Sequence, residues 1–143
     1  MFSVTPTDIR DVSIAIRDAV APVFLLTGVG SILSVVVNRL SRTIDRARYL
    51  TNLNIEQKQK HKSELKIIAQ RIPWMRSAVF LLIFAGFFVS LVIGAIFMSV
   101  AVHIDLADFV LISFITAMFS LILGLISFLK EIILALKEVI IET

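Results

Sequence analysis

Three long stretches of the chain carry no charged residue, and strongly polar segments separate them. These stretches are residues 19–38, 77–102 and 109–129. A helix that crosses the roughly 30 Å hydrocarbon core of a bilayer needs about 20 mainly apolar residues, and each stretch is long enough. All three are apolar on every side, whereas the strands of a membrane barrel alternate in polarity. The pattern therefore predicts three transmembrane helices.

The composition supports a membrane protein over a soluble one. Hydrophobic residues make up 58% of the 143 residues and charged residues only 17%, against about 45–50% and about 25% in soluble domains. The segment before the first span carries more acids than bases, so it lacks the positive region of a signal peptide. The absence of cysteine excludes disulfides and thiolate metal sites. We therefore predict an all-α integral membrane protein with a single domain.

The loop between the first two spans sets the predicted orientation. Residues 39–76 hold ten Lys and Arg against three acids, while residues 103–108 hold two acids and no base. Loops rich in Lys and Arg stay in the cytoplasm. The predicted order is an outer N-terminal helix (1–18), the first span (19–38), a cytoplasmic basic loop (39–76), the second span (77–102), an outer loop (103–108), the third span (109–129) and a cytoplasmic amphipathic tail (130–143).

The cytoplasmic loop has the pattern of an antiparallel helical hairpin. The first arm is expected to continue the first span without a break, and residues 54–57 are the expected turn. One apolar stripe contains Leu40, Ile44, Ala47, Leu50 and Leu53, and the other, a heptad seam, contains Leu65, Ile68, Ile72, Met75 and Val79. Pro73 is expected to kink or restart the second arm.

The two ends of the chain are also expected to be helical. Thr5 or Thr7 is the expected N-cap of the first helix. The tail places the apolar Ile133, Leu136, Val139 and Ile140 against charged residues. Such a tail either lies on the membrane or packs on the hairpin, and both alternatives stay open.

Small and hydroxylated residues in the second and third spans indicate close helix contacts or a pore lining. Small residues spaced by four let helix backbones approach each other in lipid. The candidate residues are Gly86, Ser90, Gly94, Ser113, Thr116, Ser120, Gly124 and Ser127. Because three helices form a thin bundle with more than one contact face each, we expect a homo-oligomer.

A basic cluster follows the first span directly. It contains Arg39, Arg42, Arg46 and Arg48, of which the first three are expected to share one helix face. Such a cluster is a topology signal that also meets membrane lipid phosphates. The alternatives are a binding site for an anion or lipid headgroup, or the basic vestibule of a channel. Aromatic residues are too few here for base stacking, which argues against nucleic acid.

The most distinctive residues resemble a known family. The run Ala-Pro-Val-Phe-Leu-Leu at residues 21–26 precedes Asn-Arg-Leu-Ser-Arg at 38–42 and Asp-Arg-Ala-Arg at 45–48. This arrangement resembles a bacterial inner-membrane family catalogued as a domain of unknown function, of the DUF2721 type. The resemblance covers nearly the whole chain. It implies a bacterial inner-membrane location and brings no activity, cofactor or catalytic residue.

The sequence carries no catalytic motif of the phosphate-loop, HExxH or GxSxG type. His103, Asp105 and Asp108 are interpreted as a polar turn rather than a metal site. We predict no catalytic residue, metal or cofactor. The leading hypothesis is a non-enzymatic homo-oligomer that assembles through its helices and hairpin. The alternative is an anion-favouring ion channel with a basic cytoplasmic vestibule, and a third hypothesis is a membrane organiser that binds anionic lipid.

Overall fold

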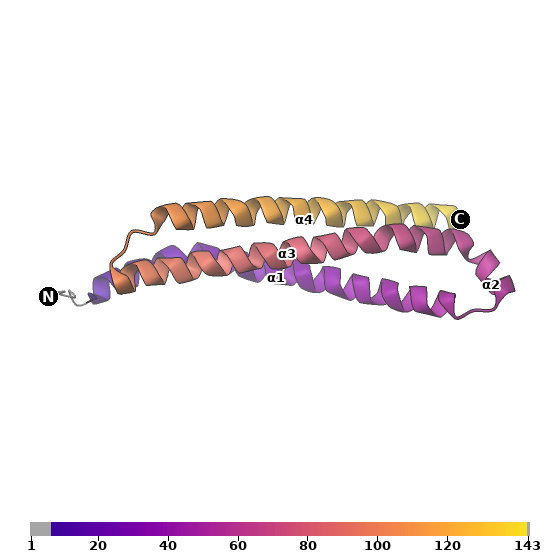
Figure 1. Ribbon diagram of the computed structural model, residues 1–143, viewed down its shortest axis with the longest axis horizontal. Helices are drawn as coiled ribbons and strands as arrows, with labels where there is room; N and C mark the ends of the chain where they lie inside the picture. The colour runs from indigo at the N-terminus through magenta and orange to yellow at the C-terminus, as the bar shows by residue number, and fades with distance from the viewer. Residues whose placement is uncertain (1–6, 143) are drawn as a thin grey trace.

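The computed structural model describes residues 7–142 as four helices and their connections. These are α1 (Ile9–Thr51), α2 (Ile55–Lys60), α3 (Lys62–Val102) and α4 (Ala107–Glu142) (Figure 1). Three of them, α1, α3 and α4, are long and apolar enough to cross a membrane. This confirms the all-helical fold class and the prediction of three helices that are able to span a membrane.

The three long helices run side by side, with α3 packed against both of the others (Figure 1). The connection between α1 and α3 lies at the same end of the molecule as the end of α4; we call this the loop end. The start of α1 and the connection between α3 and α4 lie at the opposite end. Because α1 and α4 mostly contact α3 rather than each other, each keeps a broad face open to its surroundings.

Helix α1 is one continuous helix of 43 residues, as expected for a first span that continues into the loop. Six of its seven buried residues recur every seven positions, and Ala19 is the seventh; the six are Ala15, Pro22, Val29, Val36, Thr43 and Leu50. This spacing keeps one narrow side of α1 against α3 along the whole helix. We call this buried side the α1 seam.

Two local expectations at helix ends were wrong, and of the kink or restart expected at Pro73 the restart does not occur. The N-cap of α1 is Asp8, whose side chain accepts from the Arg10 backbone N–H; Thr7 precedes the cap, and Thr5 lies outside the described residues. The chain turns at residues 52–54, and residues 55–57 begin the short α2 instead of forming the turn. Helix α3 continues through Pro73 without a break, so no helix restarts there.

Helix α4 packs on α3 through small side chains. Its buried positions Ser113, Ala117, Ser120, Gly124, Ser127 and Glu131 alternate in steps of four and three. A Cβ atom added at Gly124 would lie 3.3 Å from the Leu81 and Leu82 side chains. The two backbones are therefore close, as small-residue packing in lipid requires. The central core cluster contains Val36, Ala78 and Leu82, with Leu121 and Phe128 of α4 packed against it.

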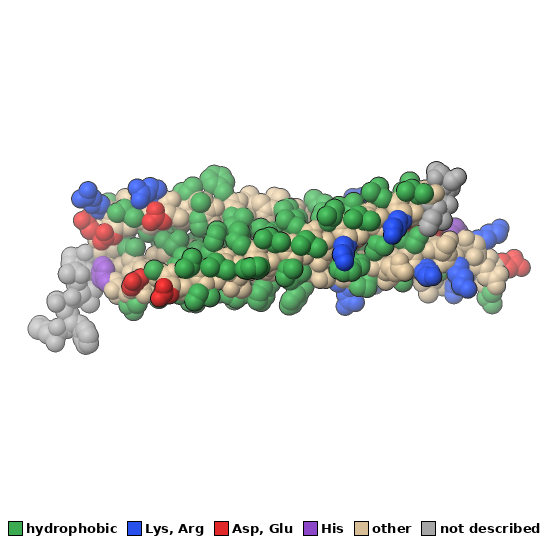
Figure 2. All heavy atoms as spheres, turned by 90° about the horizontal axis from the view of Figure 1, so that it is seen from above, with side chains coloured by type: hydrophobic (Ala, Val, Ile, Leu, Met, Phe, Trp, Pro, Cys, Tyr) green, Lys and Arg blue, Asp and Glu red, His purple; other side chains and the backbone are tan. Residues whose placement is uncertain are grey.

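The tail runs along α3 as an unbroken continuation of α4. Of the two open alternatives, the structure therefore favours packing on the second arm of the loop. The four apolar tail residues are exposed: Ile133, Leu136, Val139 and Ile140. Figure 2 shows hydrophobic side chains over the middle of the visible face and charged groups toward its two ends.

Candidate functional site

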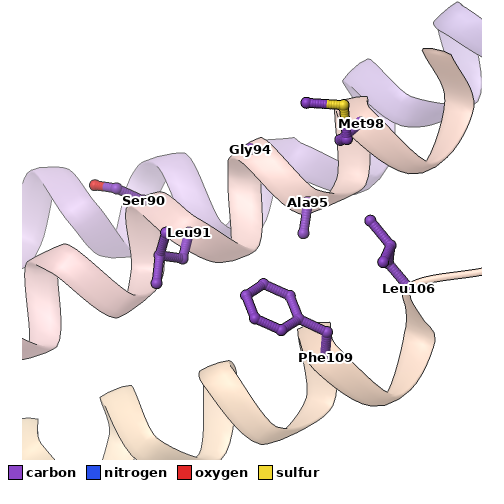
Figure 3. Close-up of a pocket in the computed structure, with 7 residues that line it drawn as sticks. All are labelled: Ser90, Leu91, Gly94, Ala95, Met98, Leu106 and Phe109. Carbon is purple, nitrogen blue, oxygen red and sulfur yellow. The ribbon is translucent and has the colours of Figure 1, made fainter. Parts of the chain in front are cut away.

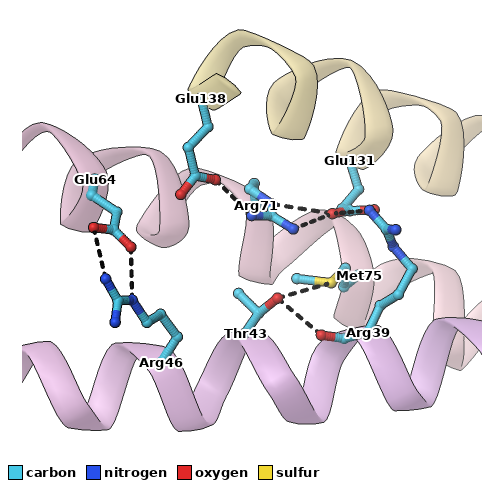
Figure 4. A network of polar contacts seen from close by, with 8 residues as sticks. All are labelled: Arg39, Thr43, Arg46, Glu64, Arg71, Met75, Glu131 and Glu138. Atoms are coloured by element: carbon cyan, nitrogen blue, oxygen red, sulfur yellow. Dashed lines mark hydrogen bonds and ion pairs between the residues drawn. The ribbon is translucent and has the colours of Figure 1, made fainter. Parts of the chain in front are cut away.

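A buried carboxylate lies where the three long helices meet at the loop end (Figure 4). The Glu131 side chain of α4 is fully buried, with 0% of its surface exposed. Arg39 of α1 donates to it from Nε and Nη2, at 3.2 and 3.1 Å from Oε2. Arg71 of α3 donates from Nε and Nη2 to Oε1, at 3.1 and 2.8 Å. One carboxylate thus joins guanidinium groups from both other helices.

The fourth member of this group is Glu138, which accepts from Arg71 Nη1 at 2.7 Å. We call Arg39, Arg71, Glu131 and Glu138 the ionic cluster. Its two guanidinium groups and two carboxylates balance in formal charge. Burying charges is costly unless they are paired and hydrogen-bonded, and bidentate arginine–carboxylate pairs are among the strongest of such contacts. The cluster meets this condition within the chain itself.

A second ion pair lies farther toward the loop end. Arg46 Nε donates to Glu64 Oε1 at 2.8 Å, and His61 Nδ1 lies 3.2 Å from Glu64 Oε2. The hydrogen bond from Arg46 is the main reason that the pKa of Glu64 lies below 4.5, although partial burial of the carboxyl group opposes this shift. Between the two ion-paired sites, the Thr43 hydroxyl donates to the Arg39 carbonyl oxygen at 2.9 Å.

The four arginines of the basic cluster predicted from the sequence differ in their contacts. Arg39 and Arg46 pair with acids of other helices. Arg42 and Arg48 are exposed and make no ion pair with any residue that the structure describes. Arg39, Arg42 and Arg46 lie within about 60° of one another around α1, as expected for one helix face, but among the described residues only Arg39 and Arg46 pair with an acid of another helix.

The predicted small residues are divided in a similar way. On α4, Ser113, Ser120, Gly124 and Ser127 face α3, and the Ser120 hydroxyl donates to the Leu81 carbonyl oxygen at 2.6 Å. Thr116 instead donates to the Ile112 carbonyl of its own helix. The serines of the third span are therefore packing residues in this chain.

The small residues of the second span face two directions. A Cβ atom added at Gly86 would lie 3.6 Å from Leu26 of α1, so Gly86 faces α1. Ser90 and Gly94 are exposed instead. They line an apolar groove of about 410 Å³ between α3 and α4 (Figure 3).

The comparisons with known proteins identify the family. A family model described as a protein of unknown function, DUF2721, matches residues 19–141. The chain belongs to this family. This confirms the resemblance found in the sequence. No curated protein and no solved structure matches the chain. The matched range of DUF2721 contains all four residues of the ionic cluster.

Sequence reasoning missed three of the four residues of that cluster: Arg71, Glu131 and Glu138. The available signal was the seven-residue spacing of the two acids, which places them on one side of a helix. Glu131 lies 60 positions from Arg71 and 92 positions from Arg39, and Glu138 lies 67 positions from Arg71. No local pattern links residues so far apart.

At the opposite end, the polar residues form the turn between α3 and α4. His103 ends α3 in the left-handed conformation, with φ 54°. The Asp105 side chain accepts from the Ala107 backbone N–H at 3.0 Å. The Ser99 hydroxyl donates to the Ile104 carbonyl oxygen at 2.7 Å. His103 and Asp105 thus have structural positions in this turn.

Proposed function

We propose that this protein is a non-enzymatic, homo-oligomeric assembly protein of the bacterial inner membrane. The observation that supports this most is the burial of Glu131 between arginines of the two other helices. Both carboxylate oxygens are occupied by groups of the same chain. Such a cluster fixes the helices relative to each other, and its charged groups are already bonded to one another. An active site, in contrast, needs groups that can reach a substrate.

The proposed homo-oligomer rests on the open faces of α1 and α4. Both pack mainly on α3, so neither covers the outward side of the other. Small and polar residues on such an open face make better contacts with another helix than with lipid. Additional copies of the chain would supply those helices.

In this proposal the loop end is a cytoplasmic helical hairpin. The ten Lys and Arg of residues 39–76 favour the cytoplasmic side, and α4 ends at the same end of the molecule as the connection between α1 and α3 (Figure 1). The N-terminus is then outside and the C-terminus inside. A reporter fused after Glu56 should be cytoplasmic and one inserted at Asp105 external. The reverse pattern would refute this orientation.

The mass of the detergent-extracted protein tests the assembly. Native mass spectrometry in mild detergent should give one discrete multiple of the 15.9 kDa chain. The same multiple should be found in lipid nanodiscs, which controls for detergent effects. A monomeric mass under both conditions would contradict the proposal.

An oligomeric ion channel is a second candidate, and one observation favours it. Thr27, Ser31 and Ser34 are exposed in the middle of the first span, on a face that a ring of copies could turn toward an axis. The serines of the third span pack on α3, so a path through one chain's α3–α4 contact is disfavoured. Planar-bilayer recording is the test. Arg42 is exposed. A current that prefers anions, and whose preference is lower in the Arg42→Glu variant, would favour the channel over the structural proposal.

Binding of anionic lipid is compatible with both candidates. Arg42 and Arg48 are exposed just beyond the first span, where each basic residue near an anionic leaflet adds about 1 kcal/mol of attraction. On α3 and α4, Trp74 and Lys130 form a cation–π contact, with Nζ 4.6 Å from the ring centroid. Such a pair is typical of the membrane interface.

A further inference from the structure

Helix α1 carries a second regular stripe, on the side turned away from the rest of the chain. It consists of Thr27, Ser31, Ser34, Asn38 and Ser41, all exposed. We call it the polar stripe. With about 3.6 residues per turn, these residues lie roughly 130–170° around the helix from the middle of the α1 seam. Four of the five lie within the predicted first span.

Lipid is a poor neighbour for this stripe. Two of its hydroxyl groups are satisfied by their own helix, since Thr27 donates to the Val23 carbonyl and Ser31 to the Thr27 carbonyl. The side chains of Ser34 and Asn38 make no hydrogen bond within the described part of the chain. A hydroxyl or amide group that faces hydrocarbon without a partner is unfavourable, and such groups typically bond across helices.

The same side of α1 continues beyond the span with unpaired charges of both signs. Asp45 is exposed and lies three positions from both Arg42 and Arg48, yet none of the three makes an ion pair within the described chain. Arg39 and Arg46, in contrast, are both paired. In a parallel second copy the acid of one chain lies about one helical turn along the axis from the two bases of the other, so the charges are placed for diagonal pairing between copies.

From this we infer that the polar stripe is the contact face between copies, and that its occupant is α1 of a second copy of this chain. The inference rests on the proposed function and names the surface that the homo-oligomer uses. Parallel copies in one membrane place the same residues at the same depth, so hydroxyl and amide groups meet their equivalents. These groups both donate and accept hydrogen bonds, and the flanking Asp45 and Arg48 fit the same alignment.

Disulfide cross-linking tests the inference directly, because the chain has no cysteine. Single variants Ser31→Cys, Ser34→Cys and Asn38→Cys should each give a covalent dimer in native membranes under mild oxidation. Matched controls are Ile122→Cys and Ile126→Cys, which are exposed on α4, and Val35→Cys, which is exposed beside the stripe on α1. We expect several-fold more dimer from the stripe positions than from the controls.

Charge exchange at the loop end provides a second, independent test. Asp45→Arg should lower the dimer yield of Ser34→Cys several-fold, and adding Arg48→Asp should restore much of it. Strongest cross-linking at Ile122 or Ile126, or no difference among the α1 positions, would overturn the inference. If the native mass is nevertheless that of a multimer, the proposed homo-oligomer is retained and only the contact face is refuted. A monomeric native mass would refute both the homo-oligomer and the contact face.

Discussion

Replacing Glu131 by glutamine should destabilise the protein by about 3 kcal/mol. Removing one partner of a buried ion pair typically costs about 3–5 kcal/mol, because the remaining charge stays buried without compensation. Here Arg71 keeps Glu138 as a partner, and Arg39 is 37% exposed and can turn toward water. Both features place the expected cost at the lower end of the range. At 1.4 kcal/mol per tenfold change, this is roughly a hundredfold in the unfolding equilibrium constant.

The assay is equilibrium unfolding in mixed micelles with increasing sodium dodecyl sulfate, followed by circular dichroism. Glu56→Gln is a matched control on an exposed residue of α2, and we expect it to stay within about 0.5 kcal/mol of the unchanged protein.

A charge-balanced double variant separates the ion pair from simple packing. Glu131→Leu alone leaves Arg39 without its acid. Glu131→Leu with Arg39→Leu leaves Arg71 and Glu138 as a neutral pair, so the double variant should be more stable than the single one. A cost below about 1 kcal/mol for Glu131→Gln, or a double variant no better than the single one, would refute this account of the cluster.

Three further changes test the remaining contacts by the same unfolding assay. Gly124→Val should cost about 1–3 kcal/mol through overpacking, since its Cβ would meet Leu81 and Leu82 at 3.3 Å, while Gly28→Val, with open space around it, is the control. Ser120→Ala should cost about 0.6 kcal/mol and Thr116→Ala less, because only Ser120 bonds to another helix. The pKa of Glu64 is lowered in the folded protein. Its ion pair with Arg46 therefore stabilises the fold above pH 4.5, and this stabilisation is lost as the pH falls through the pKa of the folded protein. The difference in unfolding free energy between the unchanged protein and Arg46→Gln should accordingly shrink in acid. An equal difference at pH 7 and in strong acid would contradict this.

The three spans could be predicted from the sequence because membrane insertion depends on a one-dimensional property, the length of chain without charge. Residues 19–38, 77–102 and 109–129 each lie within one long helix of the structure. The packing role of Ser120 and Gly124 was also predictable, since small residues on one side of a span leave little else for that side to contact. These predictions depend on residues within a few turns of each other.

The ionic cluster was beyond such reasoning because it depends on tertiary contacts. In the tail, Ile133 and Leu136 form an apolar side, and the apolar side of a helix normally turns inward, which would leave the acids facing outward. The structure turns the acids inward instead, because Arg71 of α3 lies beside them. The choice between the two sides was decided by ion pairs with residues at least 60 positions away.

The two sides of α1 connect the internal fold to the proposed assembly. At about 1.5 Å per residue, the 43 residues of α1 extend about 65 Å, roughly twice the hydrocarbon thickness. The helix has no break between the span and the loop end, so a rotation at Arg39 also turns Ser34 and Asp45. The hydrogen bonds from Arg39 to Glu131 oppose that rotation by holding one side of α1 toward α4. Glu131→Gln should therefore lower the dimer yield of Ser34→Cys as well as the stability, whereas Gly28→Val should leave that yield unchanged. Full cross-linking in a destabilised Glu131→Gln variant would show that the ionic cluster holds the helices together without setting which side of α1 faces outward.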